Sequence, residues 1–89
     1  MLPTNFEEYV ELMELRRQEQ NLQIDCRIAN RELNDYLDEH EMKNKSEYDL
    51  SAKSLEITLC KLHMELAKIH ENLAKNEHNQ WFVRMQEMI

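Results

Sequence analysis

Apolar residues in the second half of the chain recur at alternating steps of four and three positions. This rhythm places them along one side of a helix, in a row called a seam below, and is typical of a helix that packs lengthwise against another helix. The pattern predicts a long helix over about 47–88. The seam positions are Leu55, Leu59, Leu62, Leu66, Ile69 and Leu73.

The first half of the chain carries a weaker seam with the same rhythm, which predicts a helix over about 5–42. Thr4 and Glu7 have the spacing of a capping box at its start, where each side chain accepts from a free backbone amide of the first turn. The seam positions are Glu8, Leu12, Leu15, Glu19, Leu22, Cys26, Ala29, Leu33, Tyr36 and His40.

The segment 43–46 between the two patterns is expected to form the turn. Asn44 tolerates the left-handed backbone conformation that ends many helices. Ser46, with Asp49 three residues later, is expected to cap the second helix. The polar run 76–80 is a candidate interruption of that helix, and residues 1–89 are expected to form a single helical domain.

The two seams agree on one antiparallel register. If the chain folds back at Asn44, facing positions have residue numbers that add to 88. Small residues then meet large ones, as in Ala29 against Leu59, which a packed interface requires. The sequence therefore predicts an all-α fold, an antiparallel two-helix coiled-coil hairpin. The facing pairs are Tyr36–Ala52, Leu33–Leu55, Ala29–Leu59, Cys26–Leu62, Leu22–Leu66, Glu19–Ile69 and Leu15–Leu73.

A three-helix bundle is the alternative fold, with the first helix broken within 16–21. Leu15 and Leu22 are seven residues apart, so the seam crosses this stretch in phase. This continuity favours the hairpin over the bundle.

The second helix carries another apolar row on the side opposite its seam. A helix that is apolar on two sides is usually buried on both, and the chain has no third long helix to cover this row. We therefore expect an interface with another chain, either a homodimer that forms a four-helix bundle or a groove for another protein's helix. The row comprises Ile57, Cys60, Met64, Ala67, Ala74, Trp81, Met85 and Met88, interrupted by Glu71 and His78, and the predicted interface also includes Phe82, Phe6, Tyr9, Val10 and Met13.

Composition narrows the class of protein. The chain has no Gly and one Pro, Pro3, so it lacks the residues that usually interrupt helices. A net charge of −7 without a basic run argues against direct nucleic-acid binding. No secretory signal or membrane span is expected, and Cys26 and Cys60 are too few for a disulfide framework. These features favour a soluble, cytoplasmic, intracellular protein.

The chemically active side chains form no familiar catalytic pattern. None of the four histidines follows a Glu by three residues, as a di-iron bundle requires, and no catalytic triad or phosphate-binding loop is evident. We expect no enzyme activity, cofactor or metal site. Cys60 and His63, one turn apart, leave a metal-binding bundle as a third alternative. Glu19, with His70 and Arg16 nearby, is expected to form a polar layer that fixes the register.

Acidic residues line one edge of the first helix at 4-3 spacing. Such an edge could imitate phosphates and occupy a basic nucleic-acid-binding surface of a target protein, as a viral or phage inhibitor would. The favoured interpretation is a solvated edge, partly neutralised by Lys61, Lys68 and Lys75 across the hairpin. The acidic stripe consists of Glu7, Glu11, Glu14, Asp25, Glu32, Asp35 and Glu39.

Together these patterns predict a non-enzymatic helical protein–protein interaction module, such as an adaptor, chaperone, regulator or inhibitor. It is expected to self-associate and to act by binding another protein. The acidic inhibitor is the alternative function, because a helical hairpin alone does not specify its partner.

Overall fold

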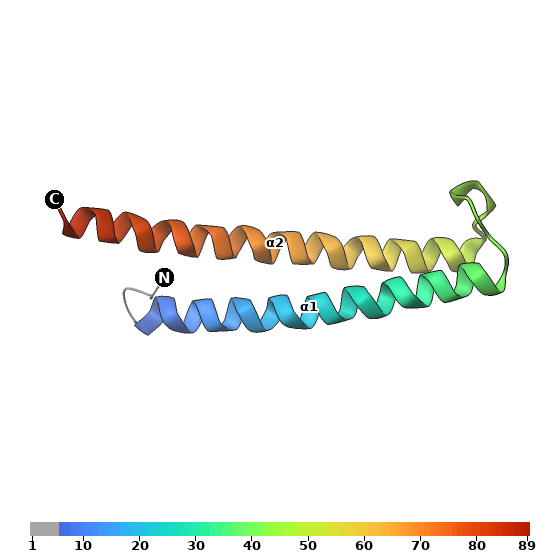
Figure 1. Ribbon diagram of the computed structural model, residues 1–89, viewed down its shortest axis with the longest axis horizontal. Coiled ribbons are helices and arrows are strands. Elements are labelled where there is room, and N and C mark those ends of the chain that lie inside the picture. The colour runs from blue at the N-terminus through green and yellow to red at the C-terminus, as the bar shows by residue number, and fades with distance from the viewer. Residues whose placement is uncertain (1–5) are drawn as a thin grey trace.

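Two long antiparallel helices make up the protein in a computed structural model, which describes residues 6–89. Helix α1 spans Phe6–Glu39 and α2 spans Leu50–Glu87, with a single 3-10 turn, η1, at Lys45–Glu47 between them (Figure 1). Residues 6–89 contain no strand. The predicted all-α hairpin is confirmed, and α1 continues without a break through 16–21, so the three-helix alternative is wrong.

The buried apolar side chains lie on the predicted seam of α1 and at Ala52 of α2, the residue expected to face Tyr36. The α2 seam from Leu55 to Leu73 is half-buried along its length, because each helix is covered on one side only. A contact between Glu19 and His70 lies within one residue of the predicted register. The apolar core within 6–89 consists of Leu15, Cys26, Ala29 and Leu33 on α1 and Ala52 on α2.

The connection between the helices is longer than the predicted turn at 43–46, because α1 ends at Glu39. Glu41 takes the left-handed conformation with φ 55°, where Asn44 had been expected to do so; Asn44 is extended. The amide of Met42 donates to the carbonyl of Leu37 at 2.9 Å, and the amide of Glu41 donates to the carbonyl of Asp38 at 3.3 Å. These are the two hydrogen bonds of a Schellman helix end, formed here without a glycine.

Asp49, rather than Ser46, caps α2. Its Oδ1 accepts from the Ala52 amide at 2.8 Å, which satisfies one of the free amides in the first turn. Glu47 is occupied within the connection, where its carboxylate accepts from the Lys43 amide at 2.7 Å. Helix α2 therefore begins after Asp49, and the capping box expected at Thr4 and Glu7 involves a position outside the described residues.

Helix α2 runs unbroken through the polar segment 76–80, where an interruption was considered. Asn76 and Gln80 are 3% and 2% exposed. They continue the 4-3 rhythm beyond Leu73, so their side chains enter the space between the helices. These buried contacts explain why a polar run remains helical to Glu87.

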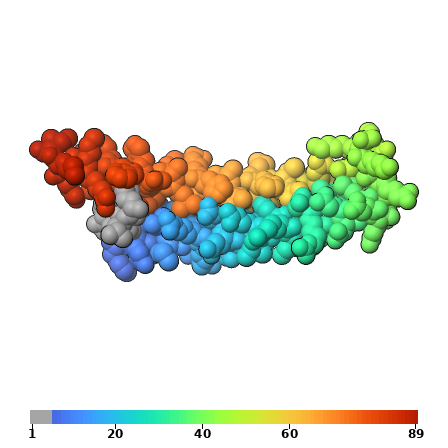
Figure 2. All heavy atoms as spheres, viewed as in Figure 1, coloured from blue at the N-terminus to red at the C-terminus, as the bar shows by residue number. Residues whose placement is uncertain are grey.

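The hairpin is elongated (Figure 2), and many of the large apolar side chains in 6–89 are exposed. It measures 62 × 20 × 16 Å, with a Cα radius of gyration of 19.0 Å, against about 12 Å for a globular domain of this length. Its accessible surface is 7069 Å², whereas a compact protein of the same mass exposes roughly 5,600 Å². Two helices packed along one line cannot enclose a core, which accounts for the difference.

Candidate protein-interaction surfaces

The outer face of α2, defined as the eight apolar residues opposite its seam, is exposed along its whole length. Its members lie about two positions away from the seam residues, which turns them away from α1. Met64, near the middle, is 71% exposed. The face comprises Ile57, Cys60, Met64, Ala67, Ala74, Trp81, Met85 and Met88.

Aromatic side chains gather at the C-terminal end of this face. The Arg84 guanidinium lies 5.7 Å from the centroid of the Trp81 ring, a cation–π arrangement. The rings of His78 and Phe82 stack with centroids 6.4 Å apart. Trp81, Phe82 and Met85 nevertheless remain about half exposed. Large aromatic side chains held in place yet accessible are typical anchors of protein interfaces.

The predicted interface residues of α1 form a second surface. Phe6, Val10 and Met13 are exposed and occupy the side of α1 that faces away from α2. Tyr9 lies beside them, about half exposed. They share one end of the hairpin with the aromatic residues of α2 but point in the opposite direction. The residues predicted as one interface therefore form two faces, one on each helix.

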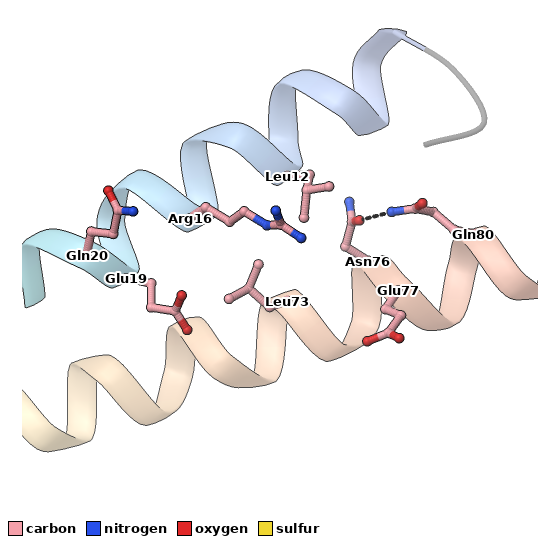
Figure 3. Close-up of a pocket in the computed structure, with 8 residues that line it drawn as sticks. All are labelled: Leu12, Arg16, Glu19, Gln20, Leu73, Asn76, Glu77 and Gln80. Carbon is pink, nitrogen blue, oxygen red and sulfur yellow. Dashed lines mark hydrogen bonds between the residues drawn. The ribbon is translucent and has the colours of Figure 1, made fainter. Parts of the chain in front are cut away.

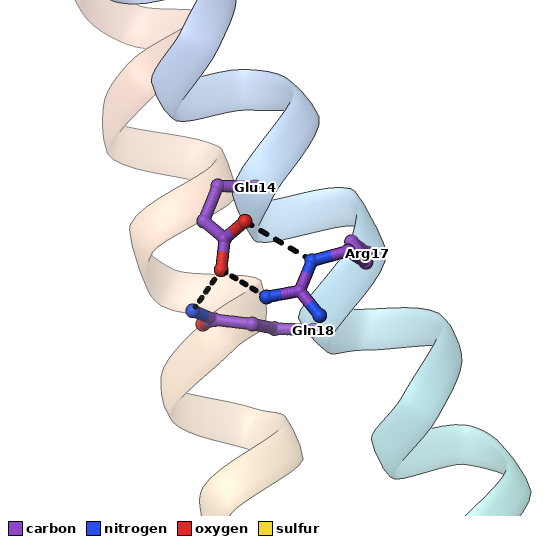
Figure 4. Close-up of polar contacts among 3 residues, drawn as sticks. All are labelled: Glu14, Arg17 and Gln18. Carbon is purple, nitrogen blue, oxygen red and sulfur yellow. Dashed lines mark hydrogen bonds and ion pairs between the residues drawn. The ribbon is translucent and has the colours of Figure 1, made fainter.

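The acidic stripe of α1 is exposed throughout 6–39. Glu14 is held by its own helix: Arg17 donates to both carboxylate oxygens and Gln18 donates to Oε1 (Figure 4). These hydrogen bonds, that from Arg17 first, hold the pKa of Glu14 below its ordinary value. In residues 6–89 none of the stripe carboxylates forms an ion pair with α2, and Lys75 pairs instead with Glu71. The expected neutralisation across the hairpin is not made by direct contacts.

A polar contact between His70 and Glu19 joins α1 to α2 within the described part of the chain. His70 Nε2 lies 2.9 Å from Glu19 Oε2, and Glu19 is half-buried in the seam. Because Glu19 stands where a leucine would otherwise pack, this contact favours the register in which its partner is within reach. Of the predicted polar layer, Glu19 and His70 are in contact, whereas Arg16 lines the neighbouring cleft.

A polar cleft that the sequence did not reveal separates the helices near the two ends of the chain (Figure 3). Its volume is about 490 Å³. Gln80 Nε2 donates to Asn76 Oδ1 at 2.5 Å, while Gln80 Oε1 has no hydrogen-bond partner within the described residues. The only sequence signal was that both amides fall in phase with the α2 seam. The cleft is lined by Leu12, Arg16, Glu19, Gln20, Leu73, Asn76, Glu77 and Gln80.

The arrangement offers few groups for metal or redox chemistry. Among residues 6–89, no three His, Cys, Asp or Glu side chains lie close enough to one another to hold a metal ion. Cys26 is buried in the seam, Cys60 is exposed on the outer face of α2, and both thiols are free. None of the helices in this part of the chain has the length and apolar character required to cross a bilayer.

Comparisons with protein-family models, curated proteins and solved structures find no match for this chain.

Proposed function

We propose that this protein is a non-enzymatic helical interaction module, which acts by binding another protein and associates with itself. The observation that carries the proposal is the exposed outer face of α2, which ends in Trp81, Phe82 and Met85. Soluble monomers rarely expose large apolar patches, because burying apolar surface is favourable.

The large solvent-accessible surface area of the hairpin supports self-association. The chain exposes roughly 1,500 Å² more than a compact protein of its mass. An interface of standard size buries about 800 Å² on each partner, so a dimer accounts for about half of this excess. A second copy is the simplest partner, because other copies of the protein are present wherever the protein is.

A homodimer through α2 leaves the outer face of α1 available for a different protein. Phe6, Val10 and Met13 point away from α2 and remain exposed when α2 is covered. We propose this face as the binding site for that protein. The free thiols of Cys26 and Cys60 suit a reducing compartment, and we propose a cytoplasmic location.

The fluorescence of Trp81 provides a test, because the chain contains no other tryptophan. If α2 pairs with a second copy, acrylamide should quench Trp81 less as the protein concentration rises. Met64→Glu places a charge in the interface and should abolish this dependence, whereas Lys61→Glu, off the outer face, should retain it. Quenching that is independent of concentration up to 1 mM would contradict self-association.

The acidic stripe supports an alternative function, the inhibition of a protein with a basic nucleic-acid-binding surface. Its carboxylates are exposed and make no ion pair with α2 in residues 6–89. In this case Glu32→Lys combined with Asp35→Lys should abolish capture of the partner, while Met64→Glu should not. The matched control is Glu65→Lys combined with Glu87→Lys, which makes the same charge change on α2.

A further inference from the structure

We infer that the second copy covers the outer face of α2 in one antiparallel register, in which facing residue numbers add to 145. This inference rests on the proposed self-association and specifies its geometry. The two α2 helices then lie in the middle of the dimer, and the α1 helices lie outside them.

The spacing of the outer face favours this register. With Glu71 and His78 included, its ten positions follow steps of three and four that read the same in both directions. An antiparallel copy can therefore place every position opposite another position of the same row. A shift of seven residues either way leaves Met85 and Met88, or Ile57 and Cys60, without a facing position of the same row. The facing pairs are Ile57–Met88, Cys60–Met85, Met64–Trp81, Ala67–His78 and Glu71–Ala74, each joining one copy to the other.

Side-chain size agrees with the register. Three of the five facing pairs join a small residue to a larger one: Ala67 to His78, Ala74 to Glu71 and Cys60 to Met85. Alternation of small and large side chains lets two helices approach closely without leaving voids. The remaining inner pair, Met64 with Trp81, joins a flexible side chain to a rigid ring, and methionine adapts readily to such a neighbour.

The two polar interruptions provide the strongest support. Glu71 of one copy faces Ala74 of the second copy, and His78 of the second copy lies one turn further along. Each Glu71 therefore lies near the other copy's His78. The Lys75 of that other copy faces position 70, next to Glu71, while it pairs within its own chain with its own Glu71 at 3.2 Å. The twofold axis generates this arrangement of Glu71 with the other copy's His78 and Lys75 twice, once on each side of the axis. The Glu71 carboxylates also offset the approach of Lys68 to Lys75 along one edge.

A parallel arrangement lacks this complementarity. In a parallel dimer, Glu71 faces Glu71 and His78 faces His78, so like groups meet within an otherwise apolar interface. Like charges that face each other in this way disfavour the arrangement. The antiparallel register instead places Glu71 opposite Ala74 and one turn from the other copy's His78.

Cross-linking through the native Cys60 tests the register. In the inferred dimer Cys60 faces Met85 of the second copy, so Met85→Cys should give a covalent dimer on mild oxidation with diamide. Within one helix these positions lie about 37 Å apart, which excludes a bond inside the chain. Arg84→Cys is the matched control, because it lies one position away on another side of α2. The covalent dimer should form at least tenfold faster with Met85→Cys, with peptide mapping assigning the bond to positions 60 and 85.

Other outcomes distinguish a failure of the inferred register from a failure of the proposed self-association. Rapid cross-linking of His78→Cys would indicate the register shifted by seven, and rapid cross-linking of the unaltered chain through Cys60 would indicate a parallel dimer. Either result, or a reduced dimer of normal mass in which Met85→Cys fails to cross-link, overturns the inferred register alone. A reduced protein that stays monomeric by light scattering overturns both the register and the proposed self-association.

Discussion

The hydroxyl of Tyr36 on α1 donates a 2.6 Å hydrogen bond to Oδ2 of Asp49, the residue that caps α2. One carboxylate thus satisfies an amide of the second helix and binds the end of the first. This contact crosses the connection, where the chain has no glycine to make a tight turn. It fixes where α2 begins relative to α1.

This contact predicts a pH dependence of stability. The hydrogen bond from Tyr36, and next that from the Ala52 amide, hold the pKa of Asp49 below its ordinary value of 3.8. Because the folded-state pKa is lowered, the stabilisation is present above the ordinary value and is lost as the pH falls through the folded-state value. Thermal melts from pH 6 to pH 2 should show a fall in midpoint that Asp49→Asn reduces.

Tyr36→Phe provides the matching control, because it removes the donor and leaves the Ala52 contact in place. Its midpoint should be lower than that of the native protein at pH 6, and the two should converge near pH 2. A constant difference between the two proteins over this range would contradict the role assigned to the Tyr36–Asp49 contact.

The left-handed backbone conformation of Glu41 predicts that a glycine at this position stabilises the protein. A residue other than glycine pays about 1–2 kcal/mol for the left-handed conformation, which Glu41 adopts with φ 55°. Glu41→Gly should therefore raise the free energy of unfolding by about 1 kcal/mol, as measured by urea titration. Glu39→Gly, in the last turn of α1, should lower it by about 1 kcal/mol. Equal effects of the two changes would show that the conformation at Glu41 costs nothing.

The amide pair in the cleft predicts strong coupling between two sites. Asn76→Leu alone leaves the buried Gln80 without its acceptor and should destabilise the protein by about 1–3 kcal/mol. Changing both residues to leucine extends the α2 seam and should be neutral or stabilising. A double-mutant cycle in urea measures this difference, and additive effects would contradict a paired role for the two amides.

Packing between the two helices predicts a large loss of stability when a buried seam residue is truncated. Leu33 is among the most buried apolar residues in 6–89, and Leu33→Ala should cost about 2–5 kcal/mol. Leu50→Ala, at a highly exposed position, should change stability by less than about 0.5 kcal/mol. The two unfolding curves together test whether the seam, rather than general hydrophobicity, stabilises the hairpin.

The seams could be predicted from sequence because their periodicity is regular. Leu55 to Leu73 repeat without exception, and the first seam keeps its phase across Glu19, so the register followed from the pattern alone. The contact of Glu19 with His70 was predictable for the same reason. The outer face of α2 could also be predicted from the sequence, since its apolar residues have the same 3-4 spacing as the seam.

The connection and the cleft were harder to predict because their causes are local or polar. Asn44 is the residue with the better left-handed propensity, yet the helix-ending hydrogen bonds of Met42 and Glu41 place that conformation at Glu41. Asn76 and Gln80 interrupted the apolar pattern, so hydropathy suggested a loosened helix. Their phase with the α2 seam buries them, and the hydrogen bond from Gln80 to Asn76 makes this burial tolerable, which an apolar count does not register.

Sedimentation equilibrium of the unaltered protein tests the central claim most directly. The chain mass is 10.9 kDa. If a second copy covers the outer face of α2, the measured mass should approach twice this value as the concentration rises to 1 mM. A mass that remains that of one chain at every concentration would contradict the proposed self-association.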